Sequence, residues 1–285
     1  MPVTSVDTIA ELRQRLGANR AAGQRVGFVP TMGYLHAGHR ALMERARADC
    51  DTVVASIFVN PLQFGPTEDL AAYPRDLAGD TDLAAGAGVD LLFVPSTEEM
   101  YPDGKVHTTV TVADVAEGLE GATRPTHFAG VATVVAKLFS IVGPCRAYFG
   151  EKDFQQVVVI TRMVRDLSMP VEVVACPTVR EPDGLAMSSR NAYLTAAERS
   201  AAPVIHQALH AGATAIQAGE RDPANVAALV EGAISAEPLA VLDYVAVVDA
   251  ATLRTIDPLR GPVRLLAAAR FGRARLIDNL GVDAG

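Results

Sequence analysis

Short apolar runs alternate with stretches of helical periodicity through the first 178 residues. Runs of consecutive apolar and β-branched residues predict strands at 26–30, 52–59, 89–94, 147–149 and 171–175. Apolar residues at helical spacing predict helices at 7–22, 38–50, 80–87, 131–142 and 153–167. Several strands are apolar at every position, which favours a parallel sheet covered on both faces. We therefore expect an α/β domain with a doubly wound parallel sheet.

The pattern changes after residue 178. Helical spacing covers 195–218, with a break at Pro203, and a second helix is expected to start at the Asp222-Pro223 pair and run to 236. Three strand-like runs follow, at 242–248, 263–269 and 274–277. Gly272 between the last two runs indicates a hairpin. We predict two domains, 1–178 and 179–285, the second a smaller α+β domain.

Composition narrows the class of protein. The 285 residues are 49% hydrophobic, which excludes a disordered chain, and no run approaches the length that spans a bilayer. The net charge of −8 argues against a nucleic-acid binder, although it allows a small basic pocket for a nucleotide. Three scattered cysteines without a CxxC pair indicate neither a disulfide framework nor a zinc ribbon. The first residues lack the pattern of a secretory signal, so we expect a soluble cytoplasmic enzyme without membrane partners.

The most informative stretch is 30–39, PTMGYLHAGH, at the junction of a predicted strand and helix. Gly33 and Gly38 would let the backbone approach a ligand, and the helix start offers N–H groups to an anion. His36 and His39 could each donate to phosphate oxygens. Two alternatives remain for the histidines: turn residues without a ligand, or zinc ligands, for which no further cysteine or histidine is suitably placed.

Two further stretches carry cations beside hydroxyl or carboxyl groups. In 150–156, Lys152 could neutralise phosphate charge, and Asp153 could cap a helix or accept from ribose hydroxyls. In 178–191, two adjacent serines precede Arg190, a combination suited to polyphosphate or simply to an exposed loop with capping serines.

A fourth stretch follows the second predicted strand. Gln63, just beyond an Asn-Pro pair, could bind a polar group of a substrate. Further along, Asp80 could hold a magnesium ion, or could be an acid favoured by the dipole at a helix start.

Common nucleotide and hydrolase motifs are missing. The sequence has no Walker A loop, no GxGxxG after a strand and no GxSxG elbow. The chain therefore combines features typical of nucleotide binding with none of the most frequent nucleotide loops.

Four ordered motifs resemble those of the pantoate–β-alanine ligase family. They are PTMGYLHAGH (30–39), FVNPLQF (58–64), GEKDFQQ (150–156) and MSSRNAYL (187–194), and the resemblance spans 26–195. The HxGH element alone is shared with a wider nucleotidyltransferase superfamily. The resemblance implies a Rossmann-like N-terminal domain, a small C-terminal lid domain, a homodimer, and the use of ATP and Mg²⁺. One departure is Ala129, where many members have a charged residue.

The same resemblance implies roles for individual residues. His39 takes the position of a proton donor, and the other catalytic residues are His36, Lys152 and Arg190. Gln63 and Gln156 would hold pantoate, and Asp80 would lie near the metal. The residues implied to line the ATP site are Met32, Gly33, Tyr34, Leu35, His36, Ala37, Gly38, His39, Gly150, Glu151, Lys152, Asp153, Val179, Met187, Ser188, Ser189 and Arg190.

The implied reaction is the ATP-dependent condensation of pantoate with β-alanine through a pantoyl adenylate. No step requires a covalent enzyme nucleophile, in agreement with the missing GxSxG elbow. Two alternatives stay open at this point: a nucleotidyltransferase of the same superfamily, and a nucleotide-binding module without catalysis.

Overall fold

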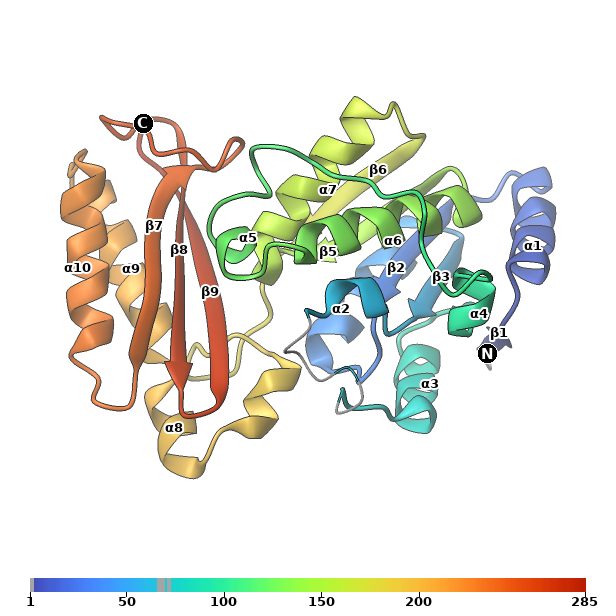
Figure 1. The fold of residues 1–285 in the computed structure, drawn as a ribbon, viewed down its shortest axis with the longest axis horizontal. Coiled ribbons are helices and arrows are strands. Elements are labelled where there is room, and N and C mark those ends of the chain that lie inside the picture. Colours follow the sequence, from blue (N-terminus) through green and yellow to red (C-terminus); the bar gives the residue numbers. More distant parts are fainter. Residues whose placement is uncertain (1–2, 66–69, 71–72) are drawn as a thin grey trace. The chain divides into compact units, whose positions relative to one another are not determined.

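A computed structural model describes residues 3–65, 70 and 73–285, and it divides the chain into two compact units (Figure 1). The first contains Met1–Gly150 and Val159–Cys176, and the second Glu151–Val158 and Pro177–Gly285. The last crossing between units lies two residues before the predicted division at 178. Residues 151–158 belong to the second unit, although they precede residues 159–176 of the first. A prediction with one domain boundary cannot describe this arrangement.

The first unit contains a six-stranded parallel sheet in the order β1-β4-β3-β2-β5-β6. Its strands are β1 (Thr4–Val6), β2 (Val26–Thr31), β3 (Thr52–Ile57), β4 (Leu91–Phe93), β5 (Cys145–Gly150) and β6 (Val171–Cys176). Strands β3 and β4 lie on one side of β2, and strands β5 and β6 lie on the other side. The strand order therefore reverses between β2 and β5, and ligands of doubly wound sheets bind at the carboxyl ends of such strands.

Helices cover both faces of this sheet. The helices of the first unit are α1 (Ile9–Ala21), α2 (Ala37–Asp49), α3 (Leu77–Gly86), α4 (Thr97–Met100), α5 (Glu120–Thr123) and α6 (His127–Val142), with a 3₁₀ turn η1 (Pro61–Gln63). Val29 packs in the core with Met43 of α2, whereas Phe139 of α6 meets Phe28 and Phe149 edge to face. Since neighbouring strand residues point to opposite faces, α2 and α6 lie on opposite sides, and the expected doubly wound α/β fold is confirmed.

The second unit is built on an antiparallel sheet in the order β7-β8-β9, coloured orange and red in Figure 1. Its elements are η3 (Ser189–Tyr193), α8 (Ala196–Ala201), α9 (Val204–Gln217), α10 (Pro223–Ser235), β7 (Val241–Asp249), β8 (Pro262–Phe271) and β9 (Ala274–Asp283). The turn η2 (Glu151–Asp153) also belongs to it, and α7 (Phe154–Asp166) passes from the second unit to the first at Val159. The antiparallel sheet and its helices enclose one apolar core that includes Leu209, Leu265 and Phe271.

Local sequence signals account for much of the second unit. The helix break falls at Pro203, between α8 and α9, and Asp222 caps α10 by accepting from the Ala224 N–H. Gly272 turns the β8–β9 hairpin with a φ of +53°, a value that favours glycine. These three predictions are confirmed.

Two strands differ from expectation. β1 is absent from the predicted elements because it has only three residues, and its pairing with β4 rather than its sequence makes it a strand. β9 continues to Asp283, six residues past its predicted end. The buried polar residues Asp278 and Asn279 interrupt its apolar pattern, and they are needed for contacts described below.

No disulfide joins the three cysteines, all of which lie in the described ranges, and burial raises the pKa of the Cys145 thiol to about 12. Over the described ranges, the structure has no helix long and apolar enough to cross a membrane.

Candidate active site

The loop between β2 and α2 has two consecutive residues with positive φ, and one carboxylate accepts hydrogen bonds from its backbone. Gly33 and Tyr34 have φ values of +83° and +53°, and the second is uncommon for a residue with a side chain. Asp80, on α3, accepts from the N–H of Tyr34 at 2.9 Å and from that of Leu35 at 2.6 Å. Asp80 is only 3% exposed, so both bonds end on a buried carboxyl group. The carboxylate thus fixes the turn that leads to the histidines.

His36 and His39 lie together at the start of α2. Their ring centroids are 4.1 Å apart, and each Nδ1 accepts a backbone N–H: His36 from Gly38 at 3.1 Å, and His39 from His36 at 3.3 Å. A neutral imidazole with an accepting Nδ1 carries its proton on Nε2. Each ring therefore has an Nε2–H donor. A Cβ on Gly38 would lie 2.8 Å from His36 Cε1, so a side chain at this position would displace the His36 ring.

Asp80 fits poorly as the principal protein ligand of a magnesium ion. Both of its carboxylate oxygens already accept backbone N–H groups. In the part of the chain that the structure describes, no group of three or more His, Cys, Asp or Glu side chains could hold a metal. The observed contacts give Asp80 a role in folding the loop.

Gln63 ends the 3₁₀ turn η1 and is 8% exposed. Its Oε1 accepts from Asn60 Nδ2 at 3.1 Å, and its main-chain carbonyl accepts from Arg124 Nη2 at 3.1 Å. His127 Nδ1 lies 3.2 Å from the same carbonyl. A Cβ on Gly130 of α6 would lie 2.2 Å from the Leu62 carbonyl oxygen, so glycine there lets α6 pack on η1.

In the second unit, the turn that carries Lys152 is held by β8 and β9. Asn279 Nδ2 donates to the carbonyls of Glu151 and Lys152, each at 2.9 Å. Arg264 donates to Glu151 Oε2 at 3.1 Å, and its guanidinium lies 3.9 Å from the centre of the Phe154 ring. Burial lowers the pKa of Arg264, an effect that the Glu151 carboxylate opposes. This buried network fixes the backbone on either side of Lys152.

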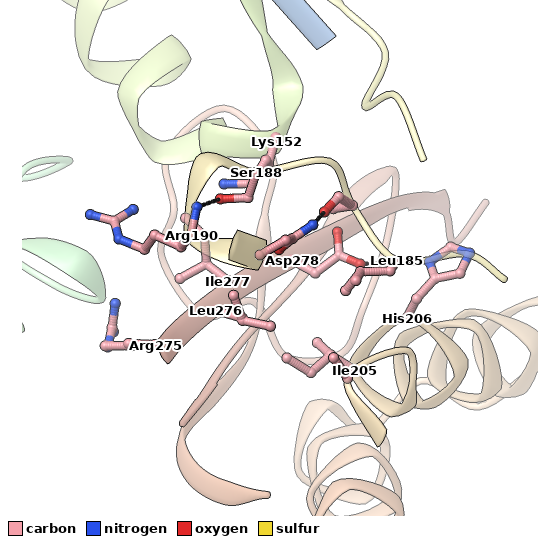
Figure 2. Close-up of a pocket in the computed structure, with 13 residues that line it drawn as sticks. Lys152, Leu185, Ser188, Arg190, Ile205, His206, Arg275, Leu276, Ile277 and Asp278 are labelled. Carbon is pink, nitrogen blue, oxygen red and sulfur yellow. Dashed lines mark hydrogen bonds and ion pairs between the residues drawn. The ribbon is translucent and has the colours of Figure 1, made fainter. Parts of the chain in front are cut away.

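Residues from separate parts of the second unit line one pocket, shown in Figure 2. Lys152, Ser188 and Arg190 of the predicted site are among them, together with Arg275 of β9. Arg275 Nε is already paired with Asp243 Oδ2 at 2.6 Å, and the Asp278 carboxylate also lines the pocket, so its lining carries charges of both signs. Sequence reasoning missed Arg275, since it lies inside a strand and in none of the four motifs.

Ser188 has the capping role left open above, because its Oγ accepts from the Arg190 N–H at 3.2 Å. The Arg190 residue is exposed, whereas the Lys152 side chain is 16% exposed and its Nζ lies 3.6 Å from Asp153 Oδ1. Asp153 ends η2 and is exposed.

A buried ion pair lies beside this pocket. Arg180 makes two bonds to Asp278, at 2.6 and 2.9 Å, and His206 Nδ1 is 3.7 Å from the same carboxylate. Burial and, second, the Arg180 charge lower the pKa of His206, so its ring is neutral at pH 7. Neither His206 nor Asp278 was a sequence candidate.

The remaining predicted residues also occupy defined places. Met187 donates its N–H to the Val179 carbonyl at 2.9 Å in a small hairpin that turns at Gly184, where φ is +93°. Gly150 ends β5, next to β2 in the sheet, and Gln156 is half-buried in the first turn of α7. Ser189 begins η3 and Ala37 begins α2.

A glycine loop with donor groups at the switch point of a parallel sheet is typical of α/β nucleotide-binding proteins. The family model of pantoate–β-alanine ligase matches residues 4–281. The chain belongs to the pantoate–β-alanine ligase family, as the four motifs indicate.

Individual relatives agree over nearly the full length. The chain is 55% identical over 275 residues to the pantothenate synthetase of Moorella thermoacetica, covering 96% of this chain and 97% of that protein. It is 57% identical over 275 residues to the pantothenate synthetase of Chloroflexus aggregans, covering 96% and 98%.

Solved structures show the same fold. Pantothenate synthetase from Thermus thermophilus superposes with a TM-score of 0.92 at 54% identity, covering 98% of this chain and 99% of that one. Pantoate-beta-alanine ligase from Francisella tularensis, complexed with beta-gamma ATP and beta-alanine, gives a TM-score of 0.78 at 35% identity, covering 98% and 97%.

Proposed function

We propose that this chain condenses pantoate with β-alanine, converting ATP to AMP and pyrophosphate. The observation that carries the proposal is the match of the family model to residues 4–281. The nucleotidyltransferase and binding-module alternatives have no comparable support.

In the first step, a pantoate carboxylate oxygen attacks the α-phosphorus of ATP. The bond from this phosphorus to the bridging oxygen breaks, and pyrophosphate leaves. Both reactants are anions, so the chain must neutralise charge and align the reacting atoms. The Nε2–H groups of His36 and His39 suit this task, because their tautomers are set by backbone bonds before any ligand arrives.

Lys152 and Arg190 supply positive charge to the same nucleotide in this proposal, and the hairpin with Val179 and Met187 lines its binding site. Lys152 and Arg190, which both line the pocket of the second unit, support an anionic ligand there. Gln63 and Gln156 bind pantoate. Asp80 acts by holding the loop of residues 33–35.

In the second step, the β-alanine amine attacks the acyl carbon of pantoyl adenylate. The bond from this carbon to the phosphate oxygen breaks, AMP leaves, and the nitrogen loses a proton. The adenylate reacts readily with water, so the small second unit is proposed to act as a lid.

Magnesium is proposed as a partner of ATP. When bound, it screens phosphate charge. Because the Asp80 oxygens already accept backbone N–H groups, the phosphates are the expected principal ligands. We also propose a homodimer working in the cytoplasm, where ATP is available.

Isotope exchange between pyrophosphate and ATP tests the reaction. We expect exchange that requires pantoate and proceeds without β-alanine, because the first step is complete before the amine is needed. Exchange without pantoate, or none from enzyme that makes pantothenate, would contradict the adenylate route.

A further inference from the structure

Asn60 is a fully buried amide at the N-terminus of η1 with four hydrogen bonds. Its Oδ1 accepts from Tyr101 Oη at 2.8 Å and from the Leu62 N–H at 3.3 Å. Its Nδ2 donates to the Gly130 carbonyl at 3.2 Å and to Gln63 Oε1 at 3.1 Å. Both acceptor positions of Oδ1 and both N–H groups of Nδ2 therefore have a partner.

Two backbone groups fix which way the Asn60 amide points. The Leu62 N–H can only donate and the Gly130 carbonyl can only accept, so Oδ1 must face Leu62 and Nδ2 must face Gly130. The Tyr101 hydroxyl, which also faces Oδ1, must then donate.

The same logic continues to Gln63. Asn60 Nδ2 donates to the Gln63 side chain, so the atom of Gln63 that faces Asn60 must be its oxygen, Oε1. No hydrogen bond among the described residues uses Gln63 Nε2, and this atom is not one of the buried side-chain atoms without a partner. Its two N–H donors therefore remain for a partner outside the described hydrogen bonds, and they match acceptor oxygens such as those of a carboxylate.

Tyr101 is well suited to serve as a fixed donor. It is 7% exposed, lies edge to face with Phe58 at 5.9 Å, and has Lys137 Nζ 5.5 Å from its ring centre. Burial raises the pKa of Tyr101 to about 12, so the hydroxyl keeps its proton across the working range of an enzyme.

We propose that Tyr101 is a positioning residue for pantoate: its buried hydroxyl holds Asn60, and Asn60 holds Gln63 with its N–H donors turned toward an acceptor oxygen of the substrate. This inference rests on the proposed function, in which Gln63 binds pantoate.

The direct test is Tyr101→Phe, which removes one oxygen and keeps the ring. We expect the KM for pantoate to rise about tenfold and the KM for ATP to change by less than about twofold. The KM does not depend on the fraction of protein that folds, so the comparison survives a loss of stability. An unchanged pantoate KM would overturn the proposal.

Tyr148→Phe is the matched control. Tyr148 is also buried, and its hydroxyl donates to Asp49 at 3.1 Å, with no hydrogen bond to Asn60 or Gln63. We expect this variant to leave both KM values unchanged even where it lowers the melting temperature. An equal rise in pantoate KM in both variants would show a general packing effect and overturn the proposal.

Variants of Gln63 separate this inference from the assignment on which it rests. We expect Gln63→Ala to raise the pantoate KM, and Tyr101→Phe to add nothing to it in the double variant. Gln63→Glu should be worse than Gln63→Ala, because an acceptor then faces an acceptor. If Gln63→Ala has no effect, Gln63 does not bind pantoate and both ideas fail. If Gln63→Ala has an effect and Tyr101→Phe has none, only the role of Tyr101 is wrong.

Discussion

Two regions are built differently: the loop of residues 33–39 in the first unit, which carries His36 and His39, and the pocket of the second unit that Lys152 and Arg190 line. In the loop, both imidazoles accept hydrogen bonds from backbone N–H groups of their own segment, and the N–H groups of Tyr34 and Leu35 donate to Asp80. In the pocket, the network fixes the main chain beside Lys152, whose Nζ lies 3.6 Å from a carboxylate oxygen of Asp153, and Arg190 is exposed.

In the proposed function, this difference separates two ways of binding a polyphosphate. Oriented donors in a rigid loop stabilise charge without reorganising when it develops. Long cationic side chains follow an anion but lose rotamer freedom on binding. The loop also has a structural cost, because Tyr34 holds a φ of +53°, worth about 1–3 kcal/mol. We therefore expect variants of the loop to lose stability as well as activity, and variants of the pocket to lose activity alone.

The largest effect is expected from Asp80→Ala. It leaves the Tyr34 and Leu35 N–H groups without their acceptor and releases the Tyr34 turn, so we expect a loss of about 3 kcal/mol in the free energy of unfolding. Adenylate formation should slow by about 100-fold or more. Urea denaturation and single-turnover kinetics measure the two. Asp82→Ala, an exposed residue on the same helix, is the control. Wild-type rates in Asp80→Ala would contradict a role in shaping the loop.

His36→Ala and Lys152→Ala provide the sharpest comparison. Sequence reasoning treats them alike, as catalytic groups. The structure predicts that both slow adenylate formation by about 100-fold, but that only His36→Ala loses stability, about 1 kcal/mol, because His36 caps α2. Lys152→Ala should stay within about 0.5 kcal/mol of wild type. Thermal unfolding distinguishes them, with the exposed Lys105→Ala as control. Equal stability losses would remove the distinction between loop and pocket.

The smallest effect is expected from Arg190→Lys, which keeps the charge and loses the planar fork. We expect about a tenfold loss in kcat/KM for ATP with no change in stability, since the Arg190 residue is exposed. Arg270→Lys, also exposed, serves as the control. A drop as large as that of Lys152→Ala would mean that Arg190 makes contacts as specific as those of the loop.

The sequence predicted the major elements of both sheets because their signals are local. Apolar runs marked five of the six parallel strands, and Pro203, Asp222 and Gly272 marked boundaries by their own backbone chemistry. It failed where pairing over long range decides, as at β1, and where buried polar residues stand in a strand, as at Asp278 and Asn279.

The candidate site shows the same division. Motif matching found His36, His39 and Lys152, but Asp80 appeared only as a metal ligand or a helix-start acid. Its contact with the N–H groups of Tyr34 and Leu35 joins residues 45 or more positions apart, and no local pattern encodes it. Tyr101 likewise lies 41 residues from Asn60.

The order of residues alone determined the family, the two kinds of sheet and most of the polar groups offered to a ligand. Only tertiary structure decided which atoms of those groups are left for it, because the tautomer of each histidine and the orientation of Gln63 depend on the hydrogen bonds that folding assembles around them. Composition and spacing specify donors and acceptors, but a side chain that can present either becomes one of them only when its other partners are in place.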